Sequence, residues 1–270
     1  AATEYGLPAG HWRQIVSRGN YRKETYFDGL WRPVFEREYD NAAATTTQRF
    51  NGRQFDMDGQ VIFAGYPRST ATSVASFTEG VTNTYDDLGR PTRVRQHSEW
   101  GNLDTVYAYL SGFETRVTNP RLQTTTTNFQ TFSHPDTSAP ILIEAPEGQV
   151  TAIARDVYGA PTVLNRQGIW NGTNLSVSRH YVYDNHRRLC KTVEPETGAT
   201  VMDYDAASNV AWSAAGVASP DVSSASACSD ARTVAYSSGR RVDRSYDARN
   251  RVITLAFPDG RGNQTWVYTA

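Results

Sequence analysis

The sequence predicts an all-β protein built from repeated antiparallel β-hairpins. Three observations support this fold class: an aromatic residue followed by Asp recurs along the chain, the flanking segments alternate between apolar and polar residues, and helical periodicity is hard to find. The 15 Tyr, 10 Phe and 6 Trp provide large apolar surfaces to bury, which is typical of a folded chain. We expect roughly 16 to 22 strands and little or no helix.

The repeat consists of an aromatic residue, an Asp, a polar turn and then an aliphatic residue. Its aspartates are Asp28, Asp56, Asp86, Asp184, Asp205 and Asp247, with a shifted seventh copy at Asp156. The long interval between Asp86 and Asp156 is expected to hide two or three degenerate copies. We place these near Tyr107, Tyr109, Phe113 and Phe129.

Each copy predicts a strand, a tight turn and a second strand. The aromatic residue ends the first strand, and the Asp side chain accepts hydrogen bonds from backbone amides of the turn. Gly89, Asn209 and Asn250 supply the Gly or Asn that tolerates a positive φ at low cost. A second turn, at residues 147–149, 196–198 and 259–261, reverses the chain between copies. Each repeat is therefore one hairpin.

We expect one hairpin array over residues 1–270, interrupted by longer connections. The Ser- and Ala-rich stretch at about 213–233 predicts a long surface loop inserted in one hairpin, and residues 68–76 and 133–140 predict shorter ones. Cys190 follows one repeat turn and Cys228 lies near the end of the inserted loop. A disulfide between them would pin that loop to its own hairpin, whereas a reducing compartment would leave two free thiols.

The repeated Tyr-Asp-x-x-Gly-Arg unit, clearest at 85–90 and over 181–268, resembles the YD-repeat (Rhs) family. The resemblance implies a continuous ribbon of hairpins that spirals into a hollow shell. In bacterial polymorphic toxins and insecticidal toxin complexes that shell encloses a toxic polypeptide, and in teneurins it serves cell-surface adhesion. It further implies a secreted or cell-surface bacterial protein, exported through signals outside this segment.

The family's shell is closed by a segment with Asp-Pro-x-Gly motifs and a self-cleaving aspartyl site. This sequence has no Asp-Pro dipeptide, and it stops where another turn and strand are due. We therefore expect an excerpt of the wall without cleavage machinery or cargo. Its partners would be the remaining repeats and an enclosed polypeptide, and its open edges, residues 5–26 and 252–268, are expected to self-associate.

Charge and hydropathy exclude several classes of partner. A formal net charge of -1 argues against a general nucleic-acid surface, because such surfaces rely on a summed positive field. No apolar run is long enough to span a bilayer as a helix.

Catalytic and metal-binding patterns are weak. The five His residues show no ligand spacing, and Asp56 and Asp58 lack the rest of a calcium loop. The paired acids Asp86-Asp87 and Glu194/Glu196 favour turn capping and solvated edges over glycosidase chemistry. No nucleotide or hydrolase motif is present, so we expect no enzyme and no cofactor.

The leading functional prediction is a structural scaffold that encloses or displays a partner polypeptide such as a toxin. The alternative is an adhesion module that binds carbohydrate or protein, since sugar rings stack on aromatic faces. Its candidate residues are Trp31, Trp100, Trp170, Trp212 and Trp266. A glycan-processing enzyme comes third.

Overall fold

The computed structural model describes residues 3–131, 136–218 and 227–269. The chain divides into two units: unit 1 comprises residues 1–110 and 115–125, and unit 2 comprises residues 111–114 and 126–270.

The strands of unit 1 are β1 (Trp12–Arg18), β2 (Tyr21–Phe27), β3 (Pro33–Asp40), β4 (Arg49–Phe55), β5 (Val61–Gly65), β6 (Gly80–Tyr85), β7 (Pro91–Ser98), β8 (Gly101–Leu110) and most of β9 (Glu114–Thr118). Its helical turns are η1 (Asn41–Ala43), α1 (Ala44–Thr47) and η2 (Val74–Ser76).

Strand β10 (Thr124–Phe129) begins in unit 1 and continues into unit 2. The further strands of unit 2 are β11 (Pro140–Ala145), β12 (Gln149–Arg155), β13 (Pro161–Trp170), β14 (Thr173–Tyr183), β15 (Leu189–Glu194), β16 (Gly198–Tyr204), β17 (Val210–Val217), β18 (Arg241–Tyr246), β19 (Val252–Ala256) and β20 (Gln264–Thr265). Helical segments are η3 (Pro146–Gly148) and α2 (Cys228–Tyr236).

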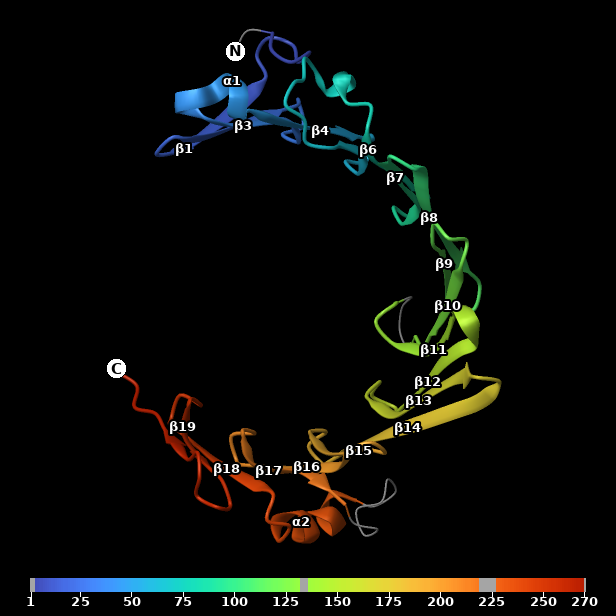
Figure 1. The fold of residues 1–270 in the computed structure, drawn as a ribbon, viewed down its shortest axis with the longest axis vertical. Helices are drawn as coiled ribbons and strands as arrows, with labels where there is room; N and C mark the ends of the chain where they lie inside the picture. The colour runs from blue at the N-terminus through green and yellow to red at the C-terminus, as the bar shows by residue number, and fades with distance from the viewer. Residues whose placement is uncertain (1–2, 132–135, 219–226, 270) are drawn as a thin grey trace. The chain divides into compact units, whose positions relative to one another are not determined.

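Within each unit, strands pair antiparallel with their neighbours in the sequence, from β1–β2 to β7–β8 and from β10–β11 to β19–β20 (Figure 1). The described residues contain twenty strands and two short α-helices, of four and nine residues. The predicted fold class and strand number are confirmed.

The repeat hairpins share one register. Thr84 pairs with Arg93, but the adjacent Tyr85 pairs with Pro91, so Thr92 is bulged. The register shifts at the same place in the hairpins of the other repeat aspartates. Their first strands end at Phe27, Phe55, Arg155, Tyr183, Tyr204 and Tyr246. Because a bulge bends a strand and increases its twist, each hairpin carries the same local distortion beside its turn.

The core of unit 1 is an aromatic cluster on strands β2–β4. It consists of Tyr26, Phe35, Phe50 and Phe77, with Tyr5, Leu7, Phe63, Ala71 and Val74 packed against it. The connection between β5 and β6 brings Phe77 onto the sheet. A Cβ at Gly52 or Gly65 would lie within 2.7 Å of the Phe77 ring, so these two glycines allow the close approach.

The core of unit 2 lies where α2 covers one face of β16 and β17 (Figure 1). Ala231 and Ala235, one helical turn apart, pack against Val201, Trp212 and further apolar residues of the sheet.

This arrangement corrects the prediction of a loop at 213–233. Residues 213–217 belong to β17 and residues 228–233 to α2, while 219–226 lie outside the described residues. The Ser/Ala-rich composition predicted a loop. In the structure, the small residues instead allow a helix to pack closely on the sheet.

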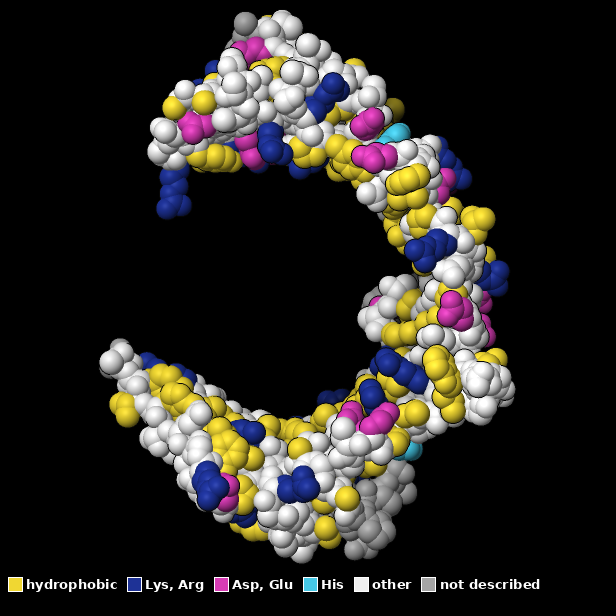
Figure 2. Space-filling model, viewed as in Figure 1, with side chains coloured by type: hydrophobic (Ala, Val, Ile, Leu, Met, Phe, Trp, Pro, Cys, Tyr) yellow, Lys and Arg dark blue, Asp and Glu magenta, His cyan; other side chains and the backbone are white. Residues whose placement is uncertain are grey.

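Among the described residues, β7–β9 and β11–β14 form a single layer of sheet. No residue of β7–β9 in unit 1, or of β11–β14 in unit 2, is buried; their side chains are half-buried or exposed. Hydrophobic and charged side chains are interspersed over the surface (Figure 2). In the described ranges, no helix has the length and apolar character required to cross a membrane.

Candidate functional site

The most regular chemical feature is the turn that follows each repeat Asp. At Asp86, the backbone amide donates to the Arg90 carbonyl at 2.9 Å, and the Gly89 amide donates to the Asp86 carbonyl at 2.9 Å. Asp86 Oδ1 accepts the amides of Leu88 and Arg90 at 3.0 and 2.9 Å. This is a three-residue hairpin loop with a left-handed residue at its end, and the carboxylate satisfies two amides that the loop leaves without a strand partner.

The same backbone bonds occur at every repeat Asp: Asp28, Asp56, Asp86, Asp156, Asp184, Asp205 and Asp247. An eighth turn lies in the long interval, at Asn119. Its Oδ1 accepts the amides of Arg121 and Gln123 at 2.9 and 3.0 Å. The sequence predicted degenerate copies in this interval, but the search required an acid and therefore did not locate this one, although the Asn side chain offers the same acceptor oxygen.

The fourth residue of each turn has a positive φ. Gly89 has φ 77° and Asn250 has φ 59°. In the Asp205 turn the left-handed residue is Ser208, at φ 66°, and Asn209 follows it. The Asn209 side chain instead donates to Asp205 Oδ2 at 3.1 Å, so it serves the carboxylate rather than the backbone conformation.

Arg is frequent at the fifth position, where it binds the second carboxylate oxygen. Nε of Arg32, Arg90, Arg188 and Arg251 donates to the Asp of its own turn at 2.7 to 2.8 Å. Each guanidinium also lies over an aromatic ring of the next hairpin, with 4.1 to 4.9 Å between the guanidinium carbon and the ring centroid. The rings belong to Phe55, Tyr109, Tyr204 and Tyr268, respectively.

The hydroxyls of the next hairpin's tyrosines complete the link. Tyr85, Tyr109, Tyr183, Tyr204, Tyr246 and Tyr268 each donate to the carbonyl of the residue that opens the second strand of the preceding repeat hairpin, at 2.6 to 3.1 Å. We call this chain of Asp, Arg and aromatic contacts the turn ladder. It connects consecutive hairpins through side chains in addition to the strand hydrogen bonds.

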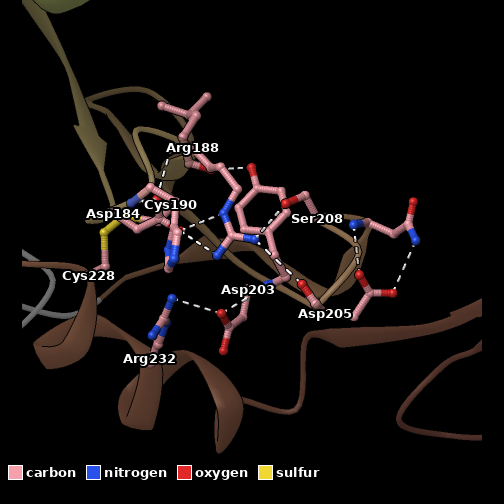
Figure 3. Close-up of polar contacts among 12 residues, drawn as sticks. Asp184, Arg188, Cys190, Asp203, Asp205, Ser208, Cys228 and Arg232 are labelled. Carbon is pink, nitrogen blue, oxygen red and sulfur yellow. Dashed lines mark hydrogen bonds and ion pairs between the residues drawn. A yellow bond between two sulfur atoms is a disulfide. The ribbon is translucent and has the colours of Figure 1, made fainter.

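Arg188 shows how the ladder passes from turn to turn (Figure 3). It binds Asp184, lies over the Tyr204 ring and donates to Ser208 Oγ at 3.1 Å. From the second turn, Asn209 Nδ2 donates to Asn250 Oδ1 at 3.0 Å. Three turns of unit 2 are thus joined by polar side chains.

The ladder also sets the ionisation of the turn carboxylates. The hydrogen bond from Arg90 lowers the pKa of Asp86, and the bond from the Arg90 amide acts in the same direction. Partial burial raises the pKa of Asp184, but the amide and guanidinium of Arg188 outweigh it, so the pKa is lowered. The pKa values of Asp28, Asp205 and Asp247 are lowered too. The turns therefore favour charged carboxylates.

Cys190 and Cys228 form a disulfide between β15 and the first residue of α2, with 5.9 Å between their Cα atoms (Figure 3). Nearby, Arg232 of α2 pairs with Asp203 of β16 at 2.7 Å, and the Tyr236 ring meets Trp212 edge-on. The helix is thus held to the sheet by a covalent bond, an ion pair and an apolar contact.

The other chemical candidates are dispersed or engaged in structural contacts. Glu194 and Glu196 both lie near the Arg179 guanidinium, at 3.7 and 3.9 Å. Among the described residues, no group of three or more His, Cys, Asp or Glu is placed to hold a metal ion.

No family model and no curated protein matches this sequence. Solved structures do resemble it. A chain of the crystal structure of TcdB2-TccC3 is 10% identical, with a TM-score of 0.49, over 92% of this chain and 15% of that one. A chain of the Photorhabdus luminescens Tc holotoxin pore with a mutant TccC3 is 9% identical, with a TM-score of 0.49, over 93% of this chain and 15% of that one.

A chain of TcdB2-TccC3-Cdc42 is 11% identical, with a TM-score of 0.30, over 92% of this chain and 18% of that one. This chain thus spans 15% to 18% of the length of these structural neighbours. Eight turns of one geometry, at the seven predicted aspartates and at Asn119, make the described part of this chain an array of repeated β-hairpins.

Proposed function

We propose that this chain is a non-enzymatic scaffold, one continuous array that forms part of a hollow β-shell enclosing or displaying a partner polypeptide. The observation that carries the proposal is the turn ladder. Consecutive hairpins are tied to one another along the sheet, while most strands have no second layer above them. Such a sheet is built to extend as a wall, and its open faces are free to meet another chain.

The disulfide supports an exported protein, because disulfides persist in oxidising compartments. The exposure of all seven residues of β1, which pairs with β2, supports association at that edge. The partners in this proposal are further repeats and an enclosed polypeptide.

Photo-crosslinking in the natural full-length protein tests enclosure. Val201 faces α2 and is fully buried, so by strand alternation the half-buried Met202 lies on the opposite face of the sheet. A crosslinker at Met202 is expected to capture the enclosed polypeptide. The matched control is Thr233, which is exposed on α2. Capture of no polypeptide from Met202, or equal capture from Thr233, would overturn the proposal.

A second function, binding of carbohydrate at a cell surface, is favoured by one specific observation. Trp100 is 94% exposed and lines a cavity of unit 1.

A further inference from the structure

The structure separates the five tryptophans that the sequence offered for ligand stacking. Trp212 is buried in the core of unit 2, and Trp31 is already stacked on Trp12 with ring centroids 4.5 Å apart. Trp100 and Trp170 are the most exposed, at 94% and 75%. Trp100 also lines a cavity, of about 640 Å³, which is within the size range of small-molecule sites.

The backbone of Trp100 is held in place by its own turn. It lies between β7 and β8, where the Ser98 hydroxyl donates to the Gly101 carbonyl at 2.7 Å and accepts the Trp100 amide at 3.3 Å. The backbone below the ring is therefore braced, although the indole makes little contact with protein. The turn therefore fixes the point from which the indole projects and leaves its face open to a ligand, while the side chain itself is ordered on binding.

The rest of the lining is polar and includes two carboxylates. It consists of Tyr66, Glu79, Gln96, His97, Ser98 and Glu99. Tyr66 and His97 are engaged: the Tyr66 hydroxyl donates to the His97 carbonyl at 2.8 Å, and His97 Nδ1 bonds the Gly80 carbonyl at 2.9 Å. Within the described residues, neither Glu79 nor Glu99 has an ion-pair partner.

We propose that this cavity binds a neutral saccharide, with Trp100 as the stacking platform and Glu79, Glu99 and Gln96 as partners of its hydroxyls. The apolar C–H face of a pyranose ring suits an indole face, and its hydroxyls donate to carboxylates in charge-assisted hydrogen bonds. No Lys or Arg lines the cavity, so two carboxylates repel uronic or sialic acids.

A neighbouring cavity of about 270 Å³ indicates room for more than one ring. Tyr66 and Glu79 line both cavities. Arg68 in the second cavity is occupied, since its guanidinium donates to the Ser76 carbonyl at 2.5 Å and lies near the Phe77 ring. The two cavities together offer room for a short oligosaccharide, and the preference for a neutral ring belongs to the cavity at Trp100, which no Lys or Arg lines.

The test is calorimetric titration of the 270-residue protein with neutral and acidic oligosaccharides, chosen from a glycan array, and with a simple alkylamine. The wild type is expected to bind a neutral saccharide saturably, and Trp100→Ala to weaken binding about tenfold or more. Trp170→Ala is the matched control, because Trp170 is an exposed tryptophan on β13 of unit 2. It should bind as the wild type does. Circular dichroism verifies that both variants are folded.

Glu99→Gln tests the charge separately. It keeps a hydrogen-bonding group, so neutral saccharides should still bind, and acidic ones should bind more tightly than they do to the wild type. Absence of saturable neutral-glycan binding, equal loss in Trp100→Ala and Trp170→Ala, or binding of the amine alone would overturn the inference. None of these results bears on capture from Met202, so the scaffold proposal stands or falls independently.

Discussion

At the residue scale, the repeat Asp acts as a turn-closing acceptor. One carboxylate oxygen receives two amides and the other often receives an Arg from the same turn, as at Asp184. The carbonyl and amide of the same residue complete the loop. A single side chain therefore satisfies groups that strand pairing leaves open at the reversal.

Asp184→Ala is expected to lower the free energy of unfolding by about 1 kcal/mol while preserving the fold, because two amides and Arg188 lose their acceptor. Asp184→Asn should cost less, since Asn119 shows that an amide oxygen performs the backbone role. Urea denaturation measures both. Equal stability of the Ala variant and the wild type would mean that the Asp does not stabilise the turn.

Leu122 has a left-handed backbone, at φ 63°, with 85% of its surface exposed. Because this conformation costs a non-glycine residue about 1 kcal/mol, Leu122→Gly is expected to stabilise the protein by up to about that amount. Gly89→Ala, at φ 77°, should destabilise it by a similar amount. Thermal melts of the two variants should shift in opposite directions.

At the element scale, hairpins are joined by rings as well as by strands. Tyr204 links the Asp184 hairpin to its successor through its hydroxyl, 2.6 Å from the Leu189 carbonyl, and through its face, which carries Arg188. These contacts explain why an aromatic residue precedes the Asp: it belongs to the preceding hairpin's interface as much as to its own turn.

Tyr204→Phe is expected to cost about 1 kcal/mol, because it removes the hydroxyl bond but keeps the ring under Arg188. Tyr204→Leu should cost more, since it removes the cation–π contact too. Tyr158→Phe is the control, because Tyr158 is 68% exposed and its hydroxyl lies outside the ladder. Equal stability of Tyr204→Phe and Tyr158→Phe, measured by urea denaturation, would contradict this account.

The disulfide restrains α2, and its cysteines are separated by 38 positions in the sequence. Replacing both cysteines by Ala is expected to lower stability by roughly 3 to 4 kcal/mol in the chain-entropy model. Hydrogen exchange of α2 should rise before that of β15 and β16. If α2 remains as protected as these strands, the apolar contacts of Ala231 and Ala235 hold the helix without the covalent bond.

At the scale of the whole molecule, acidic conditions should weaken many turns together. The pKa values of Asp28, Asp86, Asp184, Asp205 and Asp247 are lowered in the folded chain. A carboxylate with a lowered pKa stabilises the fold above its unfolded pKa of about 4, and this contribution disappears as pH falls through the folded value.

Stability should therefore be nearly constant from pH 7 to about pH 5 and fall steeply below about pH 4. Urea titrations at several pH values measure it. Asp184→Asn, which cannot ionise at that position, should show a shallower acid dependence than the wild type. An identical dependence would assign acid lability to other carboxylates.

The sequence by itself determined the hairpin repeat, because the aromatic-Asp pair is local: its turn is closed by residues within five positions of one another. Seven of the eight turns could be located this way. The Asn119 turn was not located because the search looked for Asp, although the side-chain oxygen of Asn accepts the same backbone hydrogen bonds. Tertiary structure alone decided which secondary structure the small residues between 213 and 233 adopt, since Ala231 and Ala235 form the buried face of a helix only against β16 and β17. It also decided which tryptophan borders a cavity: Trp100 and Trp212 look alike in sequence, and burial depends on which distant segment covers each one.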